Sequence, residues 1–266
     1  MNVYPTRYND LSNQGVNELY RSETWEGLNR DERLDALQEL ENRSAENLGN
    51  KPCEVRLEPM NGAQYGGYQD GVITVNENLV ENGEFTVRYA DGTTDSYAPG
   101  DTNAQLMDTI HHENYHAYQD DAINGRLEHG NQAEVEQWRA NWDNENYTRG
   151  NDPLYRVQSL EKTAFEHGET QTKDAFDEIE ANYGTDAGYQ EYLESISENS
   201  YEKSLAEAKE LYGDENIESS VNNQMMQNYQ TNYQEYASDI SKTSQVDTVN
   251  SDNSTAQYSN DAGDSL

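Results

Sequence analysis

The chain has 266 residues and a formal net charge of −35, because 52 Asp and Glu residues stand against 17 Lys and Arg residues. So few cations disfavour the binding of nucleic acid, whose phosphates must be neutralised, and of anionic membrane surfaces. The hydrophobic fraction is 33%, below the roughly 45–50% of ordinary globular domains. Composition alone therefore describes an acidic protein with one core of moderate size and polar extensions.

No apolar stretch of the sequence approaches the ~20 residues that a membrane-spanning helix needs. The N-terminal region also lacks the basic and apolar segments of a secretory signal, so we expect a cytoplasmic protein by default, with signal-independent secretion as the alternative. Cys53 has no second cysteine with which to form a disulfide or a cysteine zinc site. The sequence makes no prediction about the oligomeric state.

The N-terminal part of the chain is predicted to be helical after a short polar segment. Residues 1–11 show no periodicity, which predicts a flexible N-terminus. A short helical segment is expected within residues 16–28. Residues 29–49 predict a longer helix, because leucines recur at helical spacing and Gly49 provides a stop.

Residues 53–98 change to the two-residue period of strands and predict a small sheet of three to five strands. Gly66-Gly67, between two of these strands, indicates a turn. The expected strands are Glu54–Pro59, Gly71–Asn76, Phe85–Tyr89 and Ser96–Ala98, the last two forming a hairpin around Asp91-Gly92.

Helical spacing returns at Thr102, which with Gln105 fits a capping box at the start of a helix that ends at Asn124-Gly125. In the next helix, Trp138 and Trp142 are expected to face the core. Later helices are expected at residues 154–183, with Gly168 as an interruption, at residues 189–212, and at residues 217–240, where Tyr229, Tyr233 and Tyr236 would form a core face.

The helix from Thr102 contains the pentapeptide His112-Glu113-Asn114-Tyr115-His116, an H-E-x-x-H motif. Positions i and i+4 share one face of a helix, so both imidazoles can bind a single ion. Glu113 is turned about 100° from His112, where it can reach a water on the metal without binding the metal itself. Zinc lowers the pKa of that water toward ~7, and Glu113 would take its proton. The alternative is a solvent-exposed helix with two ordinary histidines.

A catalytic zinc normally has three protein ligands. The third histidine of the longer H-E-x-x-H-x-x-G-x-x-H motif is absent, because Gln119 and Ala122 occupy its last Gly and His positions. His129 and His167 stay open as third ligands. Glu161 is the better candidate, since a second helix with a small residue one turn away could cross the first closely.

With these residues the chain resembles the gluzincin type of zincin metallopeptidase, in which H-E-x-x-H lies on one helix and a glutamate ligand on a later one. It is similar in particular to compact bacterial members that occur as secreted or toxin-like effector domains. The likeness covers about residues 30–170 and is specific at three segments, Val72–Asn76, Thr109–Gln119 and Tyr155–Ala164.

The resemblance implies zinc bound by His112, His116 and Glu161, with Glu113 as general base and acid. The Asn-Glu-x-x-x-Asp form of the glutamate helix is not matched, because Leu160 and Phe165 stand at the Asn and Asp positions. The hydrogen-bond partners of the two ligand histidines therefore stay unidentified.

Peptide hydrolysis also needs a donor that stabilises the oxyanion. Tyr155, His167 and His129 are candidates, each against the alternative of simple packing or exposure. In zincins an extended substrate usually pairs with a strand near the active-site helix. The resemblance implies that role for Val72–Asn76, which we prefer, or for the hairpin arm near Tyr97.

Two further side chains near the motif are open to two interpretations. His111 points to another face of the helix, as a core-edge histidine or as an aid to substrate binding. Asp120, one turn after His116, is an exposed charge or a partner that orients an imidazole.

The sequence thus predicts an α+β, zincin-like fold, with a small mixed sheet packed on an active-site helix and a later glutamate helix, followed by additional C-terminal helices. The expected parts are a flexible N-terminus (1–11), the metallopeptidase domain (12–213), an additional amphipathic helix (214–240) and a disordered, acidic, polar tail (241–266).

The predicted function is a zinc-dependent peptidase that acts on a protein or peptide substrate, basic or neutral rather than acidic because the negative field repels acids. One alternative is a catalytically inactive zinc-binding interaction module, whose coordination sphere would be closed by His129 or His167. Another is a structural protein without a metal.

Overall fold

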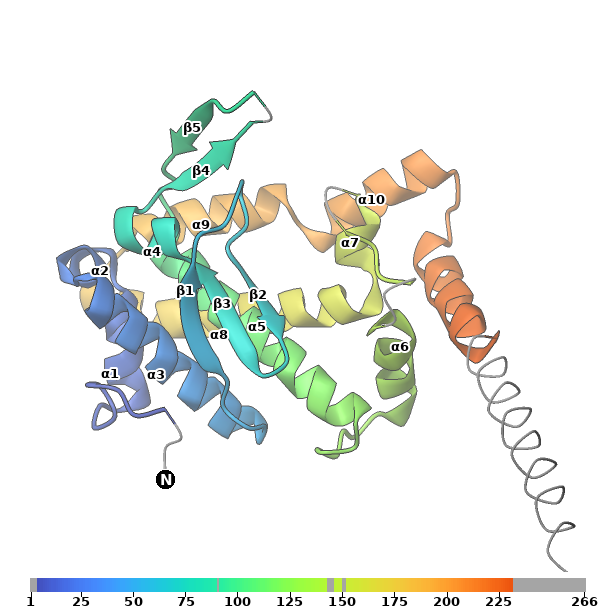
Figure 1. Ribbon diagram of the computed structural model, residues 1–266, viewed down its shortest axis with the longest axis horizontal. Coiled ribbons are helices and arrows are strands. Elements are labelled where there is room, and N and C mark those ends of the chain that lie inside the picture. The colour runs from blue at the N-terminus through green and yellow to red at the C-terminus, as the bar shows by residue number, and fades with distance from the viewer. Residues whose placement is uncertain (1–3, 90, 143–145, 150–151, 232–266) are drawn as a thin grey trace, which may run out of the picture.

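The computed structural model describes residues 4–89, 91–142, 146–149 and 152–231, and it has a mixed α+β architecture (Figure 1). The N-terminal elements are α1 (Asn13–Asn17), η1 (Glu18–Tyr20), α2 (Ser22–Gly27), α3 (Arg30–Leu48), β1 (Glu54–Glu58), β2 (Gly66–Gln69), β3 (Val72–Asn76), α4 (Glu77–Asn82), β4 (Phe85–Arg88) and β5 (Thr94–Tyr97). The later helices are α5 (Thr102–Ile123), α6 (Gln132–Trp142), α7 (Leu154–Val157), α8 (Ser159–Tyr183), α9 (Ala187–Glu198) and α10 (Tyr201–Tyr212). Residues 217–231 form one more helix, here called the C-terminal helix.

The long helix α3 has the boundaries that the sequence predicts, because both of its ends are encoded locally. The Asn29 side chain accepts hydrogen bonds from the backbone of Asp31 and Glu32, and the Glu32 carboxylate accepts one from the Asn29 backbone. This capping box satisfies N–H groups that have no partner inside the helix. At the other end Gly49 adopts a left-handed conformation, with φ of 80°.

The sheet has three strands in the order β1-β3-β2, with β1 parallel and β2 antiparallel to β3. The hairpin β4–β5 is confirmed but forms a separate two-stranded sheet. Two expectations are wrong. Gly66-Gly67 is not a turn but part of the edge strand β2, and Val72–Asn76 is the central strand, so its two edges are already paired and cannot accept a substrate strand.

Position 66 of strand β2 requires glycine because helix α5 packs closely against it. A Cβ at this position would lie 2.8 Å from Thr109 Cγ2 of α5 and 2.9 Å from the Thr74 carbonyl oxygen. Only glycine allows the edge strand to approach the helix this closely. The same position would be 3.8 Å from Glu113 Cγ, so β2 runs directly beside the H-E-x-x-H segment.

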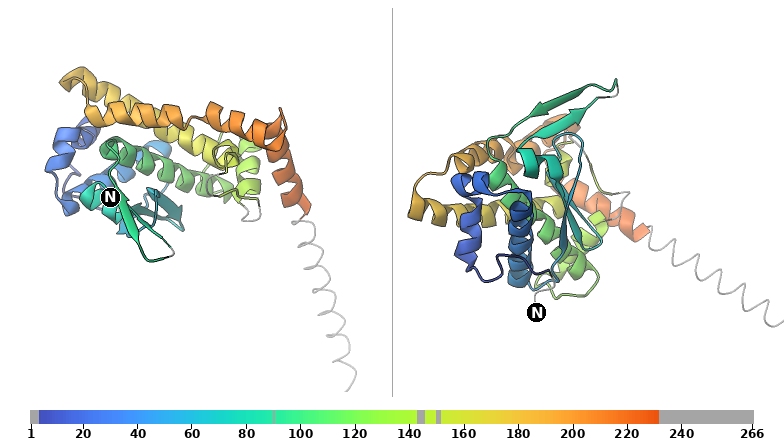
Figure 2. Two further views of the ribbon diagram at one scale, coloured as in Figure 1. Left: turned by 90° about the horizontal axis from the view of Figure 1, so that it is seen from above. Right: turned by 60° about the vertical axis from the view of Figure 1, so that its left-hand side comes forward.

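Helix α5 is the centre of the molecule. Seen from above, it lies between the sheet on one side and α8 and α9 on the other, while α3 packs along its flank (Figure 2). Its start differs from the prediction, because the N-cap is Asp101, and the Thr102 hydroxyl donates to the Pro99 carbonyl instead of closing a capping box. The helix ends at Ile123, as Asn124-Gly125 predicts.

The predicted break within residues 154–183 lies at Gln158 and not at Gly168. Gln158 has an extended backbone, with ψ of 146°, and separates α7 from α8, whereas Gly168 is inside α8. The predicted helix at 189–212 is likewise two helices, α9 and α10. Tyr233, Tyr236 and residues 241–266 lie outside the described residues.

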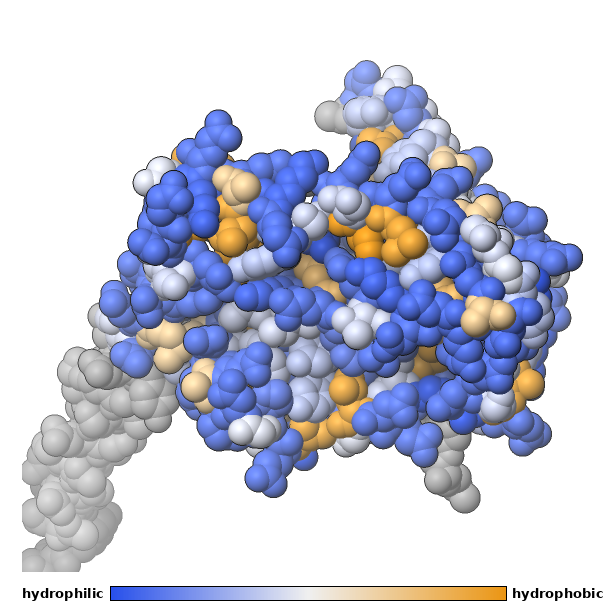
Figure 3. Space-filling model, turned by 180° about the vertical axis from the view of Figure 1, so that it is seen from behind, coloured by the Kyte–Doolittle hydropathy of each residue, from blue (hydrophilic) through white to orange (hydrophobic). Residues whose placement is uncertain are grey.

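The predicted core face of α6 is confirmed for Trp138, which is fully buried, whereas Trp142 is 36% exposed. The face opposite the sheet is hydrophilic over most of its area, with small and separate apolar patches (Figure 3). Within the described chain, no helix combines the length and apolar character that crossing a membrane requires.

Candidate metal centre

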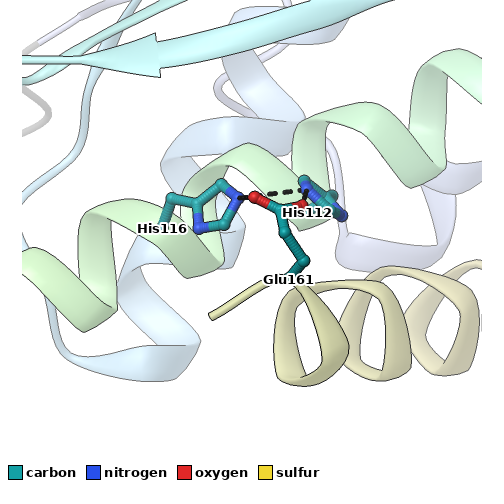
Figure 4. Close-up of side chains that lie close together, drawn as sticks. All are labelled: His112, His116 and Glu161. Atoms are coloured by element: carbon teal, nitrogen blue, oxygen red, sulfur yellow. Dashed lines mark hydrogen bonds and ion pairs between the residues drawn. The ribbon is translucent and has the colours of Figure 1, made fainter. Parts of the chain in front are cut away.

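His112 and His116 of α5 and Glu161 of α8 converge on one buried point (Figure 4). His112 Nε2 lies 3.3 Å from Glu161 Oε2, and His116 Nε2 lies 3.3 Å from Glu161 Oε1. The two Nε2 atoms are 3.1 Å apart. The Glu161 side chain is only 1% exposed, so the carboxylate faces the imidazoles and not solvent.

These separations match the ligand set of a tetrahedral metal ion. Ligand atoms at 2.0–2.1 Å from zinc are about 3.3–3.4 Å from one another in a tetrahedron. Glu161 Oε2 is buried without a hydrogen-bond partner, as expected for a carboxylate oxygen that binds a cation. Among the described residues no other His, Cys, Asp or Glu side chain joins this group. The three side chains can therefore hold a metal ion and leave a fourth position free.

The electrostatics of the site couple the carboxylate to the imidazoles. Burial would lower the pKa of His116, but the Glu161 carboxylate raises it to about 9. Burial would likewise raise the pKa of Glu161, yet His116 and His112 hold it well below its ordinary value. His116 and Glu161 thus form an ion pair, and a divalent cation that bound both side chains would displace the second proton of the imidazole.

Glu113 lies beside the ligands on the cleft side of α5 and is 9% exposed. Burial raises the pKa of its carboxyl group, while the nearby His112 and His116 lower it. A carboxyl group with a raised pKa is better suited to accept and return a proton near neutral pH.

Gln119 is the hydrogen-bond partner of His116 that the sequence left unidentified. Its Oε1 lies 2.7 Å from His116 Nδ1, and its Nε2 donates to the Leu160 carbonyl and to the Thr163 hydroxyl of α8. In the sequence, Gln119 occupies the Gly position of a longer motif and ends the segment Thr109–Gln119, but neither place predicts this hydrogen bond. Its role depends on α8 packing against α5.

Tyr147 is a side chain of the candidate site that the sequence did not single out. Its hydroxyl donates to Glu161 Oε1, and its ring lies 6.3 Å from that of Tyr155, a predicted oxyanion donor. Burial and the Glu161 carboxylate raise the pKa of both phenols, so both are protonated donors at neutral pH. No local pattern marks Tyr147, which lies between helices in a chain with 20 tyrosines.

The structure places the other histidines outside the ligand group. His167 stacks on Tyr115 with ring centroids 4.7 Å apart, and burial lowers its pKa to about 4. His129 lies between the Tyr118 hydroxyl, at 2.7 Å, and the Glu134 carboxylate, at 2.9 Å. His111 is buried and contacts the Ser44 hydroxyl through Nδ1.

Asp120 also lies away from the imidazoles. Its carboxylate accepts hydrogen bonds from the Tyr68 hydroxyl and from Arg126. It therefore links the edge strand to the end of α5 and does not orient a ligand.

Two clefts meet at the metal centre and share Glu113, Tyr147 and Tyr155 in their walls. The first, of about 790 Å³, runs along the edge strand β2 past His116 and Glu161. The second, of about 1420 Å³, lies on the His112 side. Besides Arg149 and Arg156, its wall contains seven acidic residues, namely Asp101, Asp108, Glu113, Glu169, Glu191, Glu194 and Glu198.

Comparison of the chain with protein-family models, with curated proteins and with solved structures finds no match.

Proposed function

We propose that this protein is a zinc-dependent peptidase. The observation that carries the proposal is the buried His112–His116–Glu161 group with Glu113 beside it at the junction of two clefts. A small mixed sheet, an H-E-x-x-H helix and a later glutamate helix are also the elements that the resemblance to zincins implies.

The donor set of two imidazoles and one carboxylate is one that catalytic zinc uses. Zinc held there would supply a Lewis acid that polarises the scissile carbonyl and makes water acidic enough to be deprotonated near pH ~7. Glu113 would take the proton of the attacking water and return it to the amine leaving group, so that the carboxylate is restored after each cycle.

The hydroxyls of Tyr147 and Tyr155, which line both clefts, would stabilise the charge that develops on the carbonyl oxygen of the substrate. Tyr155 is one of the three side chains that the sequence offers as candidates for this role, and Tyr147 adds a second hydroxyl that also donates to the Glu161 ligand. Removal of one oxyanion donor costs about 10²–10³ in kcat in enzymes that use such donors.

The edge strand β2 is the element best suited to bind an extended substrate. Its outer edge lines the first cleft, while its inner edge pairs with β3. An added strand there would gain main-chain hydrogen bonds without dependence on side chains.

The test begins with metal analysis of the purified protein, followed by peptide-library cleavage with and without a chelator. Glu113→Gln should bind zinc as the wild type does but should lose cleavage, because the general base is gone while the ligands remain. Glu166→Gln, an exposed glutamate on α8, is the matched control and should cleave normally.

Undiminished cleavage by Glu113→Gln would refute the mechanism. Zinc binding without turnover of any peptide by the wild type would instead favour a zinc-binding interaction module.

A further inference from the structure

We propose that the C-terminal helix (residues 217–231) sets the position of Tyr147 in the metal centre, and that it acts through Asn146. The inference rests on the proposed function, because Tyr147 matters through its hydrogen bond to the zinc ligand Glu161. It adds a positioning role for a helix that lies outside the segment resembling known peptidases.

Asn146 connects the C-terminal helix to Tyr147, its direct neighbour in the chain. The Asn146 side chain donates to the Met225 carbonyl at 3.1 Å and to the Ala140 carbonyl of α6 at 2.9 Å. Asn228 donates to its Oδ1 at 2.9 Å. Asn146 is only 7% exposed, so water cannot easily replace these partners.

The C-terminal helix is itself anchored to the body of the protein near the metal ligand. Ile217 and Met225 are each 7% exposed, although most of the helix is open to solvent. Glu218 accepts a hydrogen bond of 2.8 Å from Lys162, the residue that follows Glu161. The helix therefore contacts the chain on both sides of the Tyr147–Glu161 hydrogen bond.

On its other side Tyr147 is held by the start of α8. The Gln158 side chain, which is fully buried, accepts from the Thr148 backbone N–H and donates to the Thr148 carbonyl, each at 2.9 Å. Tyr147 thus lies between two anchored neighbours. Gln158 is the N-cap residue of the glutamate helix α8, so the C-terminal helix is the independent element that fixes the phenol against Glu161.

The test is a double-mutant cycle in zinc affinity, measured by competition with a chromophoric chelator. Tyr147→Phe should lower the affinity about 10–100-fold, as the loss of a hydrogen bond to a metal ligand does. Asn228→Ala should lower it several-fold, although residue 228 is exposed and does not belong to the ligand group. In the double variant the loss should equal that of Tyr147→Phe alone, because Asn228 acts only through Tyr147.

Asn223→Ala is the matched control, since Asn223 is an exposed asparagine on the same helix without a hydrogen bond to Asn146. Both Asn→Ala variants should melt at the same temperature, and only Asn228→Ala should lose zinc affinity. Wild-type affinity in either Asn228→Ala or Tyr147→Phe, or losses that multiply in the double variant, would overturn the inference. A protein that shows this coupling but cleaves no peptide would disprove the peptidase function and leave the positioning role standing.

Discussion

At the residue scale, Gln119 determines which nitrogen of His116 is available to a metal. Its oxygen accepts a hydrogen bond from Nδ1–H, and this assignment follows because its nitrogen donates to the Leu160 carbonyl and the Thr163 hydroxyl. With one proton held on Nδ1, Nε2 is the nitrogen that faces Glu161, and it offers its lone pair to a metal ion once the ring is neutral. One buried amide thus fixes the imidazole and also joins α5 to α8.

We predict that Gln119→Met will lower zinc affinity about 10–100-fold, because methionine keeps the volume of glutamine but cannot accept the Nδ1 hydrogen. Competition with a chromophoric chelator measures the change. Gln137→Met, on the exposed face of α6, is the control and should bind zinc as the wild type does. Equal affinities in the two variants would show that Gln119 does not orient the ligand.

At the scale of elements, the crossing of α5 and α8 brings the ligands together. Gly168 lies at that crossing, where a Cβ would overlap Asp108 Oδ1 and lie 3.1 Å from the Asp108 carbonyl oxygen and 3.3 Å from His112 Cβ. Ala164, one turn earlier on α8, is fully buried. Small residues on α8 therefore allow its approach to the H-E-x-x-H helix, and this approach sets the distance from Glu161 to the histidines.

We predict that Gly168→Ala will destabilise the protein by about 1–3 kcal/mol, because overpacking against a fixed backbone outweighs the better helix propensity of alanine. The free energy of unfolding in urea tests this expectation. Gly27→Ala provides the control, since a Cβ at the end of α2 meets no atom within 4 Å. The overpacking argument fails if Gly168→Ala is as stable as the wild type.

The Glu41 side chain of α3 connects the segment before β1 to the H-E-x-x-H helix α5. Its carboxylate is fully buried and accepts hydrogen bonds of 2.6 Å from the Cys53 backbone, just before β1, and from Asn114 in the H-E-x-x-H segment. Burial raises the pKa of Glu41 to about 8, although these hydrogen bonds oppose the shift.

This raised pKa predicts a pH-dependent stability. In the unfolded chain Glu41 ionises near its ordinary pKa of about 4.3, whereas in the folded protein it keeps its proton up to about pH 8. The stability that protonated Glu41 gives the folded protein is complete below the pKa of the unfolded chain. It declines as the pH rises toward the pKa of the folded protein, about 8. Unfolding in urea across this range should show the stability of the wild type falling relative to that of Glu41→Gln. A constant difference between the two proteins would contradict the shift.

At the scale of the whole molecule, the net charge of −35 acts together with the shape of the clefts. The cleft on the His112 side has seven acidic residues in its wall against two arginines, Arg149 and Arg156, and Arg156 is paired with Glu169 at 2.6 Å. Clefts with walls of one sign of charge concentrate ligands of the opposite sign.

We predict that peptides with Lys or Arg beside the scissile bond will be cleaved with a higher kcat/KM than matched peptides with Glu. The difference should shrink as salt is raised, because a Debye length of about 10 Å at 0.1 M screens the field of the protein. A neutral peptide measured in parallel should show little salt dependence. Faster cleavage of acidic peptides would exclude this steering.

The sequence by itself determined what depends on neighbours within a few residues. It specified the ends of α3 through Asn29 and Gly49, and the β4–β5 hairpin. It also placed His112 and His116 on one face of a helix, because the spacing i, i+4 has the same meaning in every α-helix. It proposed Glu161 from a resemblance, and no local rule could give the distance from that carboxylate to the imidazoles.

The tertiary structure decided everything that depends on which elements pack together. From sequence alone, Gly66 predicts a turn and Gly168 predicts a helix break. Both residues lie within regular elements instead, at points where a second backbone comes too close for a side chain. Strand order made Val72–Asn76 central and left β2 at the edge. Tyr147 and Gln119 entered the site through contacts with α8. Hydrophobic periodicity indicates which face of an element is buried but not which distant segment packs against it, so only the folded arrangement could reveal these roles.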